Sequence, residues 1–108
     1  MKFENRKPKE MELIKPNGCI VSKSVYDKEE KLRWLFKDIA VNETDSGWRA
    51  FGPPGDKNLI ITDLDTLINI EPLFEKVKDY PEGTDLAILE DEAGKYFVET
   101  NTGKRLWF

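Results

Sequence analysis

The chain has no histidine and a single cysteine, Cys19, among its 108 residues. Without histidine it lacks the usual general base, the partner of serine and cysteine nucleophiles, and the commonest transition-metal ligand. One cysteine also excludes an intrachain disulfide and a zinc site of ordinary composition. We therefore expect a protein that is not an enzyme and that holds no metal or cofactor.

Long apolar runs are missing as well. No stretch approaches the roughly 20 consecutive apolar residues that span a bilayer, and the first residues lack the apolar core of a signal peptide. Cys19 precedes Ile20 and Val21, which is typical of a packed thiol in a reducing compartment. The expectation is a cytoplasmic protein with no membrane partner.

Charge is distributed unevenly along the chain. Residues 1–16 carry five Lys or Arg and three Asp or Glu, whereas residues 17–103 carry 10 basic and 18 acidic groups, a net charge of −8. An acidic body repels phosphate backbones and attracts cationic proteins. A protein partner is expected, and nucleic acid is not.

The length and the 39% share of apolar residues predict one globular domain. Charge and proline dominate residues 1–16, so we expect a loosely ordered N-terminal arm followed by a single domain over residues 17–108. Alternating or β-branched apolar residues predict strands at 19–22, 32–36 and 47–51, and a hairpin that pairs 86–90 with 96–100. In the second of these strands, Trp34 and Phe36 fall on one side and Leu35 on the other.

Two short helices are expected between the third strand and the hairpin. Thr62 and Asp65 have the spacing of a capping box, and Pro72 suits the first position of a helix that reaches about Tyr80. The predicted fold class is α+β: a mainly antiparallel sheet with one or two short helices packed on one face.

Asp63 and Asp65 are the clearest carboxylate pair. Two carboxylates can support glycoside hydrolysis or bind a hard cation, but acids beside a helix start commonly stabilise its N-terminus. Helix capping is the favoured interpretation because no calcium-loop spacing follows.

The segment Gly52-Pro53-Pro54-Gly55-Asp56-Lys57 only superficially suggests a phosphate loop. Its two prolines remove amide donors, and no Gly-Lys-Ser/Thr follows. We interpret it as a stiff turn, with Asp56 as a candidate contact to a partner.

The string Asp45-Ser46-Gly47-Trp48-Arg49 is the densest unusual cluster. In a structural interpretation Asp45 or Ser46 caps a turn, Gly47 adopts a positive φ, Trp48 packs in the core and Arg49 pairs with an acid. In a functional interpretation Trp48 and Arg49 are exposed interface anchors, because Trp and Arg carry much of the energy of protein interfaces. Asp45, Ser46, Trp48 and Arg49 are therefore candidate partner-binding residues.

This string, the segment 18–23, the strand-like 32–37 and the hairpin 86–99 together make the chain resemble the DUF2185 family. These are small bacterial domains grouped with polymorphic-toxin immunity proteins. The similarity covers roughly residues 17–100; Pro53 and Pro54 depart from it, because an acidic stretch usually follows this glycine in the family. The resemblance implies a non-enzymatic protein that binds a cognate toxin and blocks it.

Three functions therefore stay open. The first is neutralisation of a toxin by direct contact, with the acidic body steered toward a cationic protein such as a nuclease with a basic groove. The second is a general interaction or regulatory module whose ligand is a host protein or a peptide at an exposed sheet edge. The third is a carboxylate-dependent hydrolase using Asp63 and Asp65.

Overall fold

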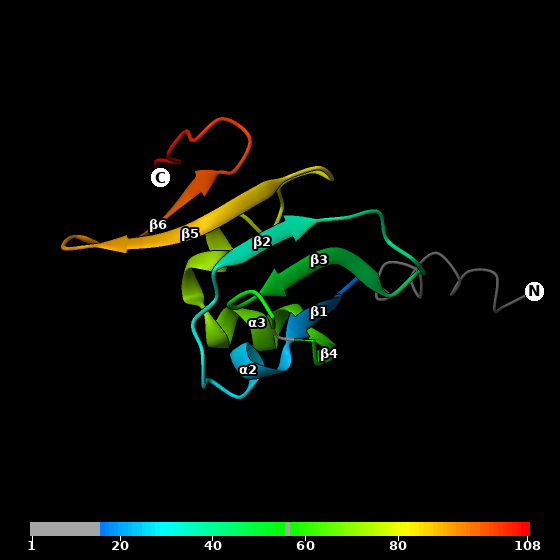
Figure 1. Cartoon of the computed structure of the whole chain (residues 1–108). Helices are drawn as coiled ribbons and strands as arrows, with labels where there is room; N and C mark the ends of the chain where they lie inside the picture. The colour runs from blue at the N-terminus through cyan, green and yellow to red at the C-terminus, as the bar shows by residue number, and fades with distance from the viewer. Residues whose placement is uncertain (1–15, 56) are drawn as a thin grey trace, which may run out of the picture.

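A six-stranded sheet dominates the computed structural model, which describes residues 16–55 and 57–108 (Figure 1). The strand order is β4-β1-β3-β2-β5-β6. The strands are β1 (Gly18–Ser22), β2 (Trp34–Lys37), β3 (Asp45–Phe51), β4 (Leu59–Asp63), β5 (Asp85–Asp91) and β6 (Gly94–Glu99). The helical segments are α2 (Lys23–Tyr26), α3 (Leu64–Ile70) and the 3-10 helix η1 (Pro72–Lys76).

The predicted α+β class with a mainly antiparallel sheet is wrong. β1 and β3 pair in parallel at the centre, so the sheet is mixed, and the helical segments are few and small. The physical reason is that β3 inserts between β1 and β2: β2 returns antiparallel to β3, and β3 then runs in the direction of β1. Alternation of side chains is the same in both kinds of pairing, so the sequence pattern does not distinguish them.

Several local predictions are confirmed. β5 and β6 form the expected hairpin, in which Leu86 is paired with Glu99 and Asp91 with Gly94. Helix α3 begins where the capping pattern indicated, although its N-cap is Asp63, whose carboxylate accepts a hydrogen bond from the Thr66 amide. Pro72 starts a short 3-10 helix in place of the longer helix expected to Tyr80. The predicted N-terminal arm lies, apart from Pro16, outside the described residues.

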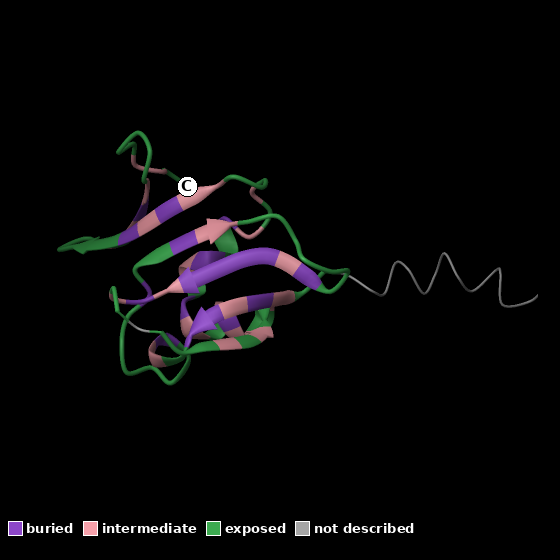
Figure 2. Ribbon diagram, turned by 45° about the vertical axis from the view of Figure 1, so that its right-hand side comes forward, coloured by how far each residue is buried: buried purple, intermediate pink, exposed green. Residues whose placement is uncertain are grey.

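The core lies between one side of the sheet and the helical segments. Trp48 from β3 meets Phe74 from η1 edge to face, with ring centroids 5.2 Å apart, and its indole N–H donates to the Lys78 carbonyl. Leu35 from β2 and Leu67 from α3 are also fully buried. Figure 2 shows β3 buried along most of its length, whereas β4 and the tip of the β5–β6 hairpin are largely exposed.

The two edges of the sheet differ. The last residues of the chain run along β6, where the amides of Glu99 and Leu106 donate to the carbonyls of Lys104 and Phe97. Within the described part of the chain, β4 pairs only with β1, so its outer edge has no strand partner. Unpaired strand edges are ready to pair with other chains unless they are covered.

Candidate functional site

The Asp45–Arg49 cluster has a local structural role. The Arg49 guanidinium donates two hydrogen bonds to the Asp45 carboxylate, from Nη1 to Oδ1 at 2.9 Å and from Nη2 to Oδ2 at 2.8 Å. The same carboxylate accepts from the amides of Gly47 and Val41. Both side chains are buried, so this ion pair is made inside the protein.

The electrostatics of this pair follow from those contacts. The hydrogen bonds from Arg49 hold the pKa of Asp45 well below its ordinary value, and the amides of Gly47 and Val41 act in the same direction against the effect of burial. Asp45 in turn raises the pKa of Arg49. Both groups therefore stay charged over the physiological range.

Gly47 and Ser46 lie where the pairing of β3 with β1 is irregular. Gly47 has a φ of 91°, and a Cβ at this position would lie 2.3 Å from the Asp38 carbonyl oxygen. Ser46 Oγ donates to the Gly18 carbonyl and accepts from the Trp48 amide. The pairing with β1 shifts between Gly18 and Ile20 at this point.

The candidate partner-binding residues are thus placed as follows. Asp45, Trp48 and Arg49 are buried and Ser46 is half-buried, as the structural interpretation of the string predicts. Asp56 lies outside the described residues. A role for the string in contacting a partner stays a prediction.

The surface that sequence reasoning missed is the side of the sheet facing away from the helices. Strand register places two rows of side chains on it, because directly paired residues project to the same side. One row contains Ile61, Ile20, Arg49, Phe36 and Asp85, and the other includes Phe51, Trp34, Ala87 and Val98. We call six of its large apolar members, all from β1 to β4, the open face: Ile20, Trp34, Phe36, Phe51, Leu59 and Ile61.

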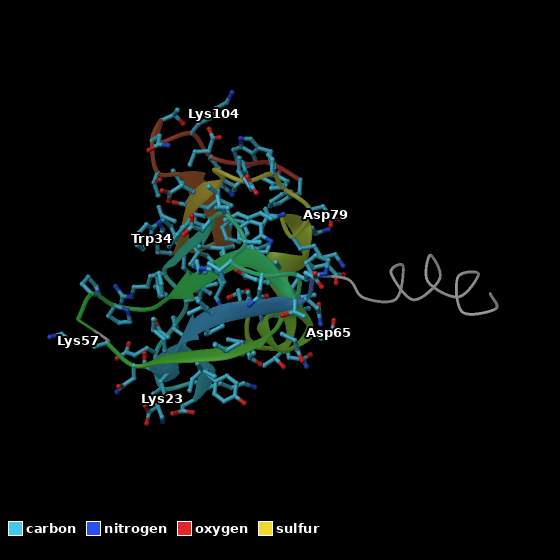
Figure 3. The ribbon with its side chains drawn as sticks, turned by 90° about the vertical axis from the view of Figure 1, so that its right-hand side faces the viewer. Lys23, Trp34, Lys57, Asp65, Asp79 and Lys104 are labelled. Atoms are coloured by element: carbon cyan, nitrogen blue, oxygen red, sulfur yellow. The ribbon has the colours of Figure 1, made fainter. Side chains whose placement is uncertain are left out.

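Three aromatic rings form the centre of the open face. The ring centroids of Trp34 and Phe36 are 4.7 Å apart, and both rings lie within 5.7 Å of Phe51. Trp34 is 41% exposed and donates its indole N–H to the Asp85 carboxylate. In Figure 3, Trp34 and Lys57 lie on one side of the molecule, while Asp65 and Asp79 lie on the other.

Strand β4 extends the open face to the edge of the sheet. Ile61 is 82% exposed and Leu59 is 52% exposed. Between β4 and Trp34 lies a groove of about 480 Å³ whose lining includes Arg33, Phe51 and Pro53. Apolar residues on both sides of β2 are the signal that could have revealed this face, because a strand covered on only one side ordinarily carries polar residues on the other.

The remaining chemistry is limited. Among residues 16–55 and 57–108 no group of three or more potential ligands could hold a metal ion. Asp63 is committed to the N-terminus of α3, where the Thr66 amide lowers its pKa, which agrees with the capping interpretation. Burial raises the pKa of the Cys19 thiol to about 12. In the part of the chain that is described, the helices are too short to cross a bilayer.

Exposed aromatic and aliphatic side chains gathered on one side of a sheet are typical of a surface that binds another molecule. Residues 19–99 match the family described as immunity protein Imm33 domain, and the chain belongs to that family. No curated protein and no solved structure matches the chain. The match confirms the predicted grouping with immunity proteins and assigns the chain a role in toxin immunity. The narrower DUF2185 assignment stays a prediction.

Proposed function

We propose that this protein neutralises a cognate toxin by binding it directly, in the cytoplasm and without chemistry of its own. Immunity implies a toxin protein as the partner. The observation that carries direct binding is the apolar side of the sheet, which no other segment among residues 16–55 and 57–108 covers. Exposed apolar patches with aromatic centres mark sites of protein association.

Charge supports a cationic toxin as that partner. The net charge of −8 over residues 17–103 attracts a basic protein and repels nucleic acid. A toxin that acts on nucleic acid needs a basic substrate groove, and an acidic inhibitor seated there would exclude the substrate. Electrostatic steering raises the association rate most at low ionic strength.

The test is co-expression of the chain with each neighbouring gene product in turn, together with co-purification of the chain and any product that proves toxic. Rescue of growth and a complex that survives gel filtration are expected. Rescue without any complex would overturn direct binding. An association rate that stays unchanged between low and high salt would overturn the steering by charge.

A further inference from the structure

We infer that the open face is the surface that binds the toxin, and that the toxin presents there an apolar centre flanked by lysine or arginine. This inference rests on the direct binding proposed above. It goes further because it names the surface and the chemistry of the partner.

The first step is that apolar side chains on this side of the sheet are not needed for the core. The core is complete on the other side, where Trp48, Leu35 and Phe74 are fully buried. Ile61 and Leu59 point away from that core, in a strand whose burial alternates between exposed and intermediate. Two large aliphatic side chains held in water in this way gain nothing for folding and are available to a partner.

The second step is that the aromatic centre is rigid before any partner arrives. Trp34 is fixed by its hydrogen bond to Asp85 and by ring contacts to Phe36 and Phe51. A large side chain already held in one conformation loses little entropy on binding. Tryptophan in such a position is a typical interface hot spot.

The third step is the charge at the two ends of the strands. Asp38 follows β2, Asp63 ends β4 and Asp85 begins β5, so these carboxylates lie at the same end of the sheet. Within the described residues none of the three forms a salt bridge, so their charge is not neutralised, although Asp63 caps α3 and Asp85 accepts the Trp34 indole N–H. Arg33 and Lys57 lie toward the opposite end of the strands, before β2 and β4. The acidic end calls for basic groups on the partner.

The fourth step is the choice of occupant. A second copy of this chain carries the same acidic body, so its net charge opposes association. A cationic toxin satisfies both the apolar centre and the acidic end. Self-association through the same face is the competing outcome, and sedimentation of the free chain distinguishes it from toxin binding.

The experiment uses charge substitutions of opposite sign at one exposed position. Ile61→Lys places a cation in the row that ends at Asp85, whereas Ile61→Glu adds an anion at the same place. Because Ile61 is 82% exposed, both variants should keep the wild-type melting temperature. Tyr26→Ala on α2 is the matched control, since Tyr26 is 41% exposed, as Trp34 is.

Binding is measured by calorimetry with the purified neighbouring gene product that the co-expression test identifies as the toxin. We expect Ile61→Lys and Trp34→Ala to raise the dissociation constant by about 30-fold or more. Ile61→Glu should raise it less than Ile61→Lys does. Tyr26→Ala should leave it within about twofold of the wild-type value. Equal losses for the two Ile61 variants would overturn the basic character of the partner surface.

The remaining outcomes separate the inference from the proposed function. Wild-type chain that binds while both Ile61 variants and Trp34→Ala bind equally well would overturn the surface and leave direct binding intact. Wild-type chain that does not bind would overturn both. A free chain that sediments as a dimer, and as a monomer after Ile61→Lys, would assign the face to self-association and overturn the choice of partner.

Discussion

Arg49 forms an ion pair with Asp45, four residues earlier in the same strand, and donates two hydrogen bonds to its carboxylate. In a regular strand two such residues would lie about 13 Å apart. They meet because β3 is irregular there: on β1 the register advances from Gly18 to Ile20, while on β3 it advances from Asp45 to Arg49. The two extra residues form a bulge, a feature that re-aims the side chains beside it.

The first prediction concerns the stability contributed by this pair. Asp45→Ala leaves the Arg49 guanidinium buried without its partner, so the free energy of unfolding should fall by about 3–5 kcal/mol. Urea denaturation at neutral pH measures the change. Glu43→Gln, an exposed acid in the preceding loop, is the control and should change stability by less than about 0.5 kcal/mol. Equal stability of the two variants would contradict a stabilising role for the pair.

The second prediction concerns acid unfolding. The pKa of Asp45 is lower in the folded chain than its ordinary value near 3.9. Its contribution to stability is therefore fully present above about pH 4 and is lost as the pH falls through the lower folded value. Wild-type protein should lose more stability between pH 5 and pH 2 than Asp45→Asn does. Parallel stability curves for the two proteins would show that Asp45 is not the group that titrates.

The third prediction separates backbone strain from a steric clash. Gly47 and Gly83 have nearly the same φ, 91° and 89°, but only at Gly47 would a Cβ meet another backbone atom, the Asp38 oxygen. Gly83→Ala should cost about 1–2 kcal/mol from the left-handed conformation alone. Gly47→Ala should cost clearly more, or prevent folding. Equal melting temperatures for the two variants would contradict the close approach of Gly47 to Asp38.

The fourth prediction compares two tryptophans on opposite sides of the sheet. Trp48→Ala empties a fully buried position and removes the hydrogen bond to Lys78, so about 3–5 kcal/mol of stability should be lost. Trp34→Ala, at a 41% exposed position, should cost less than about 1.5 kcal/mol. Chemical denaturation of both variants tests this order. A larger loss of stability for Trp34→Ala than for Trp48→Ala would contradict the assignment of Trp48 to the core and of Trp34 to the open face.

Local chemistry made part of this structure predictable. The ion pair of Asp45 with Arg49 and the positive φ of Gly47 follow from groups within five residues of one another, and so does the hairpin turn at Gly94. The close approach of Gly47 to Asp38 does not. Helix α3 was predictable for the same reason, because an acid next to free backbone amides needs no distant partner.

The rest depends on contacts between segments far apart in the chain. Ile20 pairs with both Arg49 and Ile61, and nothing in residues 18–22 indicates these partners or their directions. Which side of β2 is covered depends on where segments outside β2 pack, so Leu35 is buried while Trp34 is exposed. The open face was missed because its members come from four strands.

The central claim is that the toxin covers the open face, and hydroxyl-radical footprinting of the complex tests it most directly. Trp34 and Tyr26 are equally exposed in the free chain, so each serves as the reference for the other. We predict that bound toxin lowers the oxidation of Trp34 several-fold and leaves that of Tyr26 unchanged. Protection of Tyr26 with undiminished oxidation of Trp34 would contradict the claim.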